Sequence, residues 1–271
     1  MRKIELSNSS AQQVTPWQIS GEESSDAPQP TDVNAIRAIR SFTGPATYFR
    51  WKIYLWRFLA LFLCVPAIPA ILVLMVLVRV TSRGPAIYHQ IRVGKNGKSF
   101  TMYKLRSMRV DAECDSGPVW SQDGDARVTP IGRFLRDTHL DELPQLFNVV
   151  KGEMDLFGPR PERPEFTKVL AEEINGFQDR LQVLPGVTGL AQINLPADTD
   201  LASVRKKLIL DLEYIETASL SLDLRMLFAT FLRLFGYTNE KTLVTIGVKR
   251  TVTDDEVKAS ENSQRFLNDA N

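Results

Sequence analysis

Cysteine and histidine are scarce in this 271-residue chain, which has two of each. Cys64 lies in a long apolar run and Cys114 in a polar segment, so their surroundings favour free thiols and a reducing compartment. His89 and His139 are too few for a His-rich metal site, and the sequence has neither a CxxC pair nor an HExxH motif. The chain therefore lacks the residues of a disulfide framework and of the common zinc sites.

Acidic residues are missing from residues 33–110, a stretch that carries thirteen Lys and Arg side chains. The whole chain has 33 basic and 32 acidic residues, so the remainder is strongly acidic. Such a basic block suits anionic lipid headgroups or a phosphate-rich ligand. A solvated basic face is the alternative, but this block brackets a long apolar run. We therefore expect a membrane and phosphorylated ligands as partners, and no nucleic acid.

Large apolar residues are few in residues 1–45, which are rich in Ser, Gln, Pro, Glu and Asp. This composition predicts a disordered tail. No apolar core follows Met1-Arg2-Lys3, so the start does not resemble a signal peptide. We divide the rest into a membrane helix at 46–80, a catalytic domain at 81–237 and a polar C-terminal extension at 238–271.

Phe58–Val78 is an uncharged apolar run of 21 residues, long enough to cross a bilayer core. Pro66 and Pro69 lie inside it, and each removes a helix hydrogen bond and favours a kink. Basic residues flank both ends, and basic flanks tend to stay on the cytoplasmic side. The pattern favours a bent, re-entrant helix whose ends lie on one side, but a straight span and a buried soluble helix remain open.

The remaining elements predict a mostly helical α+β fold, with a re-entrant helix beside a compact cytoplasmic domain that has a β-hairpin and interfacial helices. Alternation and the Asn96-Gly97 turn predict a hairpin of strands 87–93 and 99–105. Lys104 and Arg106 then share a face, as a phosphate clamp or as two solvated cations. Helices are expected over 162–184, 200–218 and 222–235, the last in the core or in the membrane interface, and a short strand over 243–248.

An adjacent acid pair, Asp141 and Glu142, lies between two groups of arginines. Thr138 begins a T-x-x-D pattern that resembles a capping box. Pro144 is tolerated only within the first turn of a helix, so we expect a helix to start near Asp141. The helix dipole and the arginines would then lower the carboxylate pKa values. Adjacent side chains on a helix diverge by about 100°, which favours different roles for the two acids. The alternative is an N-cap residue followed by a solvated acid.

Several motifs occur in an order that resembles the bacterial sugar transferases, the monotopic phosphoglycosyl transferases that act on polyprenyl phosphate. They follow the proline-containing apolar run: Gln90-Ile91-Arg92-Val93-Gly94, Lys104-Leu105-Arg106-Ser107-Met108, Gly132-Arg133-Phe134-Leu135-Arg136, Asp141-Glu142-Leu143-Pro144-Gln145, Gly158-Pro159-Arg160-Pro161 and Pro185-Gly186-Val187-Thr188-Gly189-Leu190-Ala191-Gln192. The resemblance covers roughly residues 50–235.

The resemblance implies an enzyme that transfers a sugar 1-phosphate from a nucleotide diphosphate sugar, with UDP as the expected carrier, to undecaprenyl phosphate. This step would begin exopolysaccharide, capsule, O-antigen or glycoprotein glycan assembly. Asp141 would attack the β-phosphate and form a covalent intermediate, while Glu142 binds Mg²⁺ or moves a proton; both acids are candidate metal ligands. The implied phosphate- or substrate-binding residues are Lys104, Arg106, Arg127, Arg133, Arg136, Arg160, Arg163 and Gln192.

By the same resemblance, the catalytic domain would face the cytoplasm from the bacterial inner membrane, with the helix broken at Pro66 and Pro69. Val65 stands where many relatives have serine, and Asp155 is an extra acid that could bind metal or lie on the surface. The competing hypothesis is a non-catalytic, membrane-anchored scaffold that binds phosphate or nucleotide sugar. The sugar, and whether the chain forms a homo-oligomer, are left open.

Overall fold

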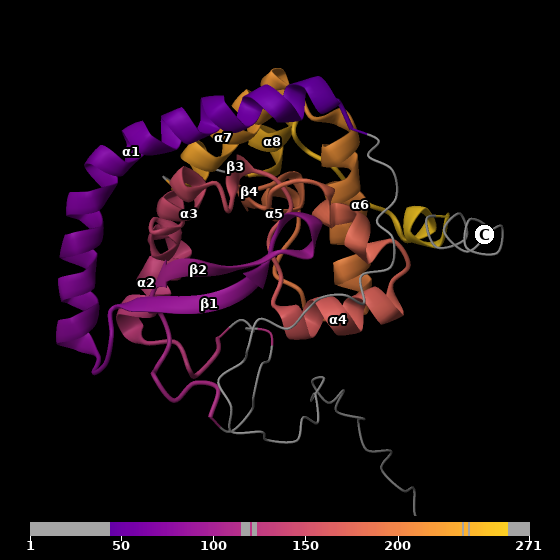
Figure 1. Ribbon diagram of the computed structural model, residues 1–271. Coiled ribbons are helices and arrows are strands. Elements are labelled where there is room, and N and C mark those ends of the chain that lie inside the picture. Colours follow the sequence, from indigo (N-terminus) through magenta and orange to yellow (C-terminus); the bar gives the residue numbers. More distant parts are fainter. Residues whose placement is uncertain (1–43, 115–119, 121–123, 235, 238, 260–271) are drawn as a thin grey trace, which may run out of the picture.

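The computed structural model describes residues 44–114, 120, 124–234, 236–237 and 239–259. Most of the predicted tail and the end of the C-terminal extension lie outside this part of the chain. The fold is a mostly helical α+β arrangement with two small sheets, as predicted. Helices surround the sheets, and the long helix α1 wraps the outside of the domain (Figure 1).

Helix α1, Ala46–Thr81, is a single helix of 36 residues that is bent into two arms (Figure 1). One arm runs across the top of the domain and the other descends along its side (Figure 1). Pro66 and Pro69 lie within the helix, and sharp kinks are almost always found at proline. We therefore attribute the bend to these two residues, as the sequence predicts.

One stripe of α1 packs on the domain along both arms, while its other faces are exposed and apolar. The buried stripe, spaced three or four residues apart, is Tyr48, Lys52, Trp56, Ala60, Cys64, Ala67, Ile71, Leu74 and Val78. Exposed residues include Phe58, Phe62, Val65, Leu72, Val76 and Val80. Among the described residues, α1 is the one helix whose length and apolar composition suffice to cross a membrane.

Two aromatic residues of the first arm of α1 are buried against one carboxylate. Tyr48 Oη and Trp56 Nε1 donate to Asp223 Oδ2 at 2.5 and 2.8 Å. This long-range partner fixes the arm to the domain, and sequence periodicity cannot reveal it. Tyr54, by contrast, is 73% exposed.

The predicted hairpin is confirmed with the predicted boundaries: β1, Ile87–Val93, pairs antiparallel with β2, Ser99–Leu105. The single turn η1, Lys95–Gly97, connects them, and Asn96 adopts a left-handed conformation with φ of 55°. Asparagine tolerates this region better than most residues, which is why Asn-Gly signals a tight turn. The register places Lys104 opposite Tyr88.

The middle of the chain forms short elements between the hairpin and the long helices. In order they are α2 (Pro130–Asp137), η2 (Leu140–Glu142), α3 (Gln145–Lys151), β3 (Asp155–Phe157), α4 (Pro164–Glu173), η3 (Phe177–Gln182), β4 (Gly186–Thr188) and α5 (Leu190–Asn194). β3 and β4 form a parallel two-stranded sheet. The single helix predicted over 162–184 was wrong, because the left-handed Gly176 separates α4 from η3.

The last helices are α6 (Leu201–Thr217), α7 (Leu220–Leu234) and α8 (Glu240–Ile246). α6 confirms the predicted helix, and Asp200 caps it by accepting from Ser203 N. α7 is a core helix along one face, since Asp223 and Met226 are fully buried, while Phe228 is 53% exposed. Its place in a membrane interface stays a prediction. The strand predicted over 243–248 was wrong: Asn239 caps a helix there by accepting from Thr242 N.

Candidate active site

Helix α2 brings its arginines to the end of β2 through a close backbone contact. The Thr129 hydroxyl accepts from Gly132 N at 3.0 Å and caps the helix, and Thr129 N donates to Ser107 O at 3.0 Å. A Cβ atom on Gly132 would stand 1.8 Å from Ser107 O, so only glycine permits this approach. Arg136 Nε then donates to Ser107 Oγ at 2.9 Å.

The acid pair lies in a tight turn between α2 and α3. Thr138 ends α2, and its hydroxyl donates back to Phe134 O at 2.7 Å, so the predicted capping box was wrong. His139 then adopts a left-handed conformation with φ of 55°, and η2 carries both acids. Pro144, which has no N–H to give, becomes the N-cap of α3, so that helix begins after the pair.

Asp141 is 7% exposed, and burial raises its pKa above the ordinary aspartate value of 3.8. Lys104, Arg160 and Arg136 oppose this shift, while the neighbouring Glu142 charge adds to it. The predicted lowering of the Asp141 pKa was therefore wrong, because loss of water outweighs the nearby cations. Such a desolvated carboxylate is a stronger nucleophile once ionised, since fewer water contacts must be broken.

Glu142 has the opposite electrostatic character. Burial alone would raise its pKa, but Arg160 and Lys104 hold the pKa of this carboxyl far below its usual range, as predicted. Arg160 Nη2 and Lys104 Nζ donate to the same atom, Glu142 Oε1, at 2.6 and 2.8 Å. The pair thus combines one acid whose ionised form is disfavoured by burial with one that stays ionised, while the predicted division of roles stays a prediction.

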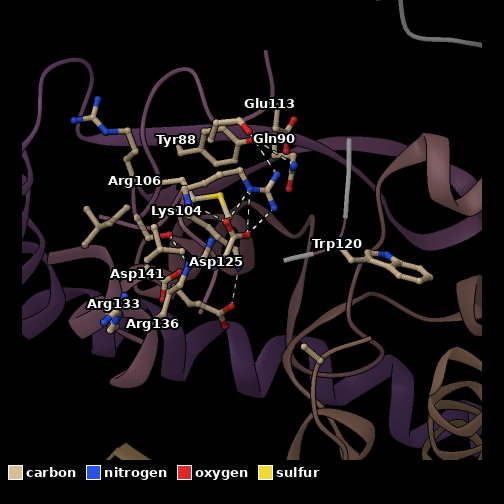
Figure 2. Close-up of a pocket in the computed structure, with 18 of the residues that line it drawn as sticks. Tyr88, Gln90, Lys104, Arg106, Glu113, Trp120, Asp125, Arg133, Arg136 and Asp141 are labelled. Atoms are coloured by element: carbon tan, nitrogen blue, oxygen red, sulfur yellow. Dashed lines mark hydrogen bonds and ion pairs between the residues drawn. The ribbon is translucent and has the colours of Figure 1, made fainter. Parts of the chain in front are cut away.

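Both acids face a cavity of about 1040 Å³ between the hairpin, α2 and the segment that follows β3 (Figure 2). This is large enough for a nucleotide-sized ligand. The residues that line it include Asp141 and Glu142 together with seven of the eight predicted phosphate- or substrate-binding residues: Lys104, Arg106, Arg127, Arg133, Arg136, Arg160 and Arg163. The structure therefore gathers into one cavity cations that are scattered over sixty positions of sequence.

The cations do not all present free charge to the cavity. Arg127 forms an ion pair with Asp125 at 2.6 Å, and Arg163 pairs with Glu113 at 2.8 Å. Arg106 Nη2 donates to the hydroxyl and carbonyl of Ser82, just beyond α1. Lys104 and Arg106 both line the cavity, but β2 ends at Leu105 and Arg106 binds Ser82 while Lys104 binds Glu142. The clamp of these two cations stays a prediction.

Gln192 is the predicted site residue that the structure places elsewhere. Its Nε2 donates to Val187 O at 2.9 Å, within the β4–α5 corner. The described residues that line the cavity do not include it. The motif around Gln192 therefore holds the backbone of β4 next to β3, where Gly158 N donates to Thr188 O at 3.0 Å.

Other side chains of the cavity were missed from the sequence. His139 and Arg233 both line it, and burial lowers the pKa of each, with Arg233 adding to the effect on His139. His139 adjoins the acid pair and could have been suspected, but Arg233 comes from α7 and only the tertiary fold brings it close. Asp155 is neither a surface acid nor near the pair: it is buried and lies 3.6 Å from Lys52.

The acid pair fits a magnesium ion that is held mainly by substrate phosphates. Within the described residues, no group of three or more His, Cys, Asp or Glu side chains is arranged to hold a metal. Mg²⁺ is commonly bound through only one or two carboxylates plus phosphate oxygens and water. Both cations contact Glu142 Oε1, so the Oε2 atom takes no part in those two contacts. The two carboxylates are thus compatible with such an ion, and Glu142 and Asp141 are the residues that would hold it.

A buried acid pair in an arginine-rich cavity, joined to a long apolar helix, defines an enzyme that handles phosphorylated substrates. The sequence model of the family described as "Bacterial sugar transferase" matches residues 48–237. The match includes all but the first two residues of α1, the acid pair and α7. The chain therefore belongs to the bacterial sugar transferase family, as its motifs predicted.

Three relatives illustrate the similarity. A Bacillus subtilis (strain 168) protein, provisionally named an undecaprenyl-phosphate N-acetylgalactosaminyl 1-phosphate transferase, is 51% identical over 150 residues, which are 54% of this chain and 83% of the relative. The UDP-glucose:undecaprenyl-phosphate glucose-1-phosphate transferase of Klebsiella pneumoniae is 43% identical over 174 residues, 64% of this chain and 37% of the relative. The UDP-N-acetylgalactosamine-undecaprenyl-phosphate N-acetylgalactosaminephosphotransferase of Aeromonas hydrophila is 42% identical over 162 residues, 60% of this chain and 38% of the relative.

Proposed function

We propose that this sugar transferase moves a sugar 1-phosphate from a UDP-sugar to undecaprenyl phosphate through a covalent intermediate on Asp141. The observation that carries the proposal is the buried Asp141 beside a Glu142 that Lys104 and Arg160 hold ionised, at the wall of a cationic cavity. The names of the relatives supply the substrate classes. The curated relatives differ in their named sugar, so the sugar itself stays outside the proposal.

In the first step, an Asp141 oxygen attacks the phosphorus that bears the sugar. The bond from that phosphorus to the bridging oxygen breaks, and the nucleoside monophosphate leaves with the bond electrons. In the second step, an oxygen of the lipid phosphate attacks the same phosphorus and the Asp141–phosphorus bond breaks, giving the lipid diphosphate sugar. Carboxylates are established nucleophiles in such two-step transfers.

The surrounding residues position the phosphates and offset their charge, which is most of what phosphoryl transfer requires. Arg160 and Lys104 lie against the acid pair, and Arg136 is held at the same wall by Ser107. Glu142 and Asp141 would hold Mg²⁺. When bound, the ion would neutralise charge on the diphosphate.

The membrane arrangement is a second part of the proposal: α1 enters one leaflet and returns, so that the domain faces the cytoplasm. Its first arm is bound to the domain at Lys52 and Trp56, and its end is bound at Ser82 through Arg106. Since both ends contact one compact domain, both ends belong on one side of the membrane. Single cysteines at Arg50 and Arg83, in a Cys64→Ser/Cys114→Ser background, should label from the cytoplasm alone; labelling from opposite sides would refute this topology.

A radiolabelled donor tests the chemistry. The purified chain is incubated with labelled UDP-sugars, undecaprenyl phosphate and Mg²⁺, and both the lipid product and acid-stable label on the protein are measured. Wild type should form lipid product with at least one donor, and Asp141→Asn should form neither product nor labelled protein. Binding of the UDP-sugar without any product would favour the non-catalytic scaffold instead. Full turnover by Asp141→Asn would refute the nucleophile.

A further inference from the structure

The short segment that carries Arg160 is held at four successive backbone carbonyls by three parts of the fold: β4, η3 and β1. Pro159 and Pro161 flank the arginine, and proline has a fixed φ and no N–H. Four carbonyls in a row accept hydrogen bonds: Pro159 from Gly186 N (2.9 Å), Arg160 from Arg180 Nη2 (2.8 Å), Pro161 from Arg92 Nη1 (2.9 Å) and Glu162 from Val93 N (2.8 Å). The segment is therefore rigid, and its position depends on these donors.

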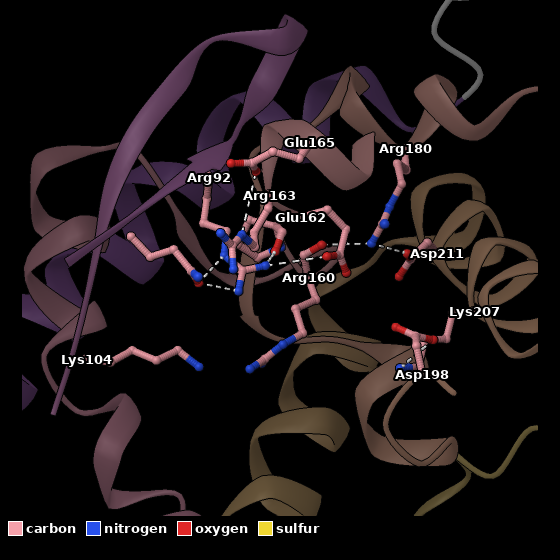
Figure 3. Close-up of polar contacts among 12 residues, drawn as sticks. Arg92, Lys104, Arg160, Glu162, Arg163, Glu165, Arg180, Asp198, Lys207 and Asp211 are labelled. Carbon is pink, nitrogen blue, oxygen red and sulfur yellow. Dashed lines mark hydrogen bonds and ion pairs between the residues drawn. The ribbon is translucent and has the colours of Figure 1, made fainter. Parts of the chain in front are cut away.

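The donor to Arg160 is itself a buried charge with one strong partner. Arg180, in η3, lies 2.7 Å from the carboxylate of Asp211 in α6, and the two side chains are 8% and 2% exposed. The Arg180 guanidinium also packs over the Phe177 ring at 5.1 Å. Its Nη2 atom donates to the Arg160 carbonyl and forms an ion pair with Asp211 Oδ2 without hydrogen-bond geometry, so the carboxylate holds the guanidinium beside that carbonyl by charge attraction (Figure 3).

On its other side, Arg160 reaches the acid pair. Figure 3 shows its guanidinium extending toward Lys104, away from Arg180 and Asp211. The described residues that line the cavity include Arg160 but neither Arg180 nor Asp211. We propose that Arg180 and Asp211 are positioning residues that fix the Arg160 guanidinium against Glu142 and the reacting phosphate. The proposal rests on the phosphoryl transfer proposed above.

Rigidity explains how a change outside the cavity would reach the reaction. The flanking prolines fix their own φ angles and restrict the residue before each of them, so little local rotation can absorb a shift and movement at the Arg160 carbonyl passes to its side chain. A misplacement of about 1 Å in a catalytic group costs roughly 100-fold in rate. Loss of Asp211 would also leave Arg180 as a buried charge without its carboxylate, and such a charge tends to seek water.

A double-mutant cycle separates positioning from a purely structural role. Arg180→Gln alone should lower kcat/KM roughly 10- to 100-fold. If Arg180 acts through Arg160, the same change in an Arg160→Ala background should cost less than about threefold. Glu213→Gln is the matched control, because Glu213 also lies in α6 and pairs with an arginine, but that arginine is Arg250 and not Arg180. It should leave kcat/KM unchanged.

Arg180→Lys serves where the glutamine variant fails to fold, as judged by thermal unfolding of every variant. Lysine keeps the charge beside Asp211 but lacks the planar fork that reaches two acceptors, so it should fold and still lose about tenfold in kcat/KM. An active wild type with unchanged Arg180→Lys activity would overturn the positioning role and leave the proposed function intact. The positioning role would also be overturned if the loss of kcat/KM in the double variant equals the product of the losses in Arg180→Gln and Arg160→Ala. A wild type that forms no product with any donor would overturn the proposed function and the positioning role together.

Discussion

Lys52 Nζ lies 3.2 Å from Asp223 Oδ2, and both side chains are almost completely buried. Lys52 also donates to Phe157 O at 3.0 Å and to Tyr214 Oη at 2.5 Å. These contacts join the first arm of α1 to β3, α6 and α7. A lysine that the sequence presents as part of a basic flank is thus a structural centre of the domain.

Removing this lysine should destabilise the protein more than any exposed charge change. Lys52→Met leaves Asp223 and Asp155 buried without their cation, and breaking a buried pair in this way costs about 3–5 kcal/mol. The melting temperature in detergent should fall clearly. Lys95→Met, on the exposed hairpin turn, is the control and should change stability by less than about 0.5 kcal/mol. Equal melting temperatures for the two variants would contradict the structural role.

Gly132→Ala should destabilise the protein although alanine favours helices. Intrinsic propensity alone would stabilise α2 by about 1 kcal/mol. The added Cβ, however, would stand 1.8 Å from Ser107 O, and overpacking typically costs about 1–3 kcal/mol. α2 must then move away and carry Arg136 with it, so activity should fall as well. A denaturation curve and kcat together check this; unchanged or higher stability would show that the contact is not close.

As the pH is lowered, kcat/KM should begin to fall at a higher pH than it would with an aspartate of ordinary pKa. Burial raises the pKa of Asp141, so the nucleophile becomes protonated as the pH drops through a value above 3.8, and the acid limb of kcat/KM lies there. Lys104 lowers this pKa, so Lys104→Met should move the limb to still higher pH and also reduce the maximum rate. Lys151→Met, which removes an exposed charge outside the cavity, is the control. If the acid limb of kcat/KM lies at the same pH in Lys104→Met as in wild type, Asp141 is not the group whose protonation causes it.

Chelation should stop the reaction without unfolding the protein. We expect EDTA to abolish lipid product and excess Mg²⁺ to restore it, because the two acids supply few ligands and the substrate phosphates supply the rest. The melting temperature should not change with chelation in the absence of substrate, since a loosely held ion contributes little to folding. Undiminished activity in EDTA would remove magnesium from the mechanism.

Local patterns predicted those elements whose signals lie within a few residues. The hairpin strands and α6 have the predicted extents, because alternation, Asn96-Gly97 and Asp200 act over short distances. The C-terminal helix α8 was mistaken for a strand because seven residues with four β-branched side chains also suit a strand. Its cap, Asn239, decides the outcome in the structure.

The site was predicted as a set of residues but not as a geometry. Motif order indicated Asp141, Glu142 and seven of the cations that line the cavity. It could not indicate that Arg160 and Lys104 share one oxygen of Glu142, or that burial reverses the pKa shift of Asp141. These features depend on contacts between distant segments, as does the arrival of Arg233 from α7.

The buried stripe on α1 means that the apolar helix is also part of the hydrophobic core of the domain. Trp56, Ala60 and Val78 fill the interior of the domain, while the opposite faces of the same turns are apolar and exposed. Deleting the helix to obtain a water-soluble enzyme would therefore remove part of the hydrophobic core and expose the rest of it to water. The lipid or detergent around the exposed faces of α1 contacts the same helix that forms part of the core. We therefore expect the free energy of unfolding to depend on the composition of that lipid or detergent.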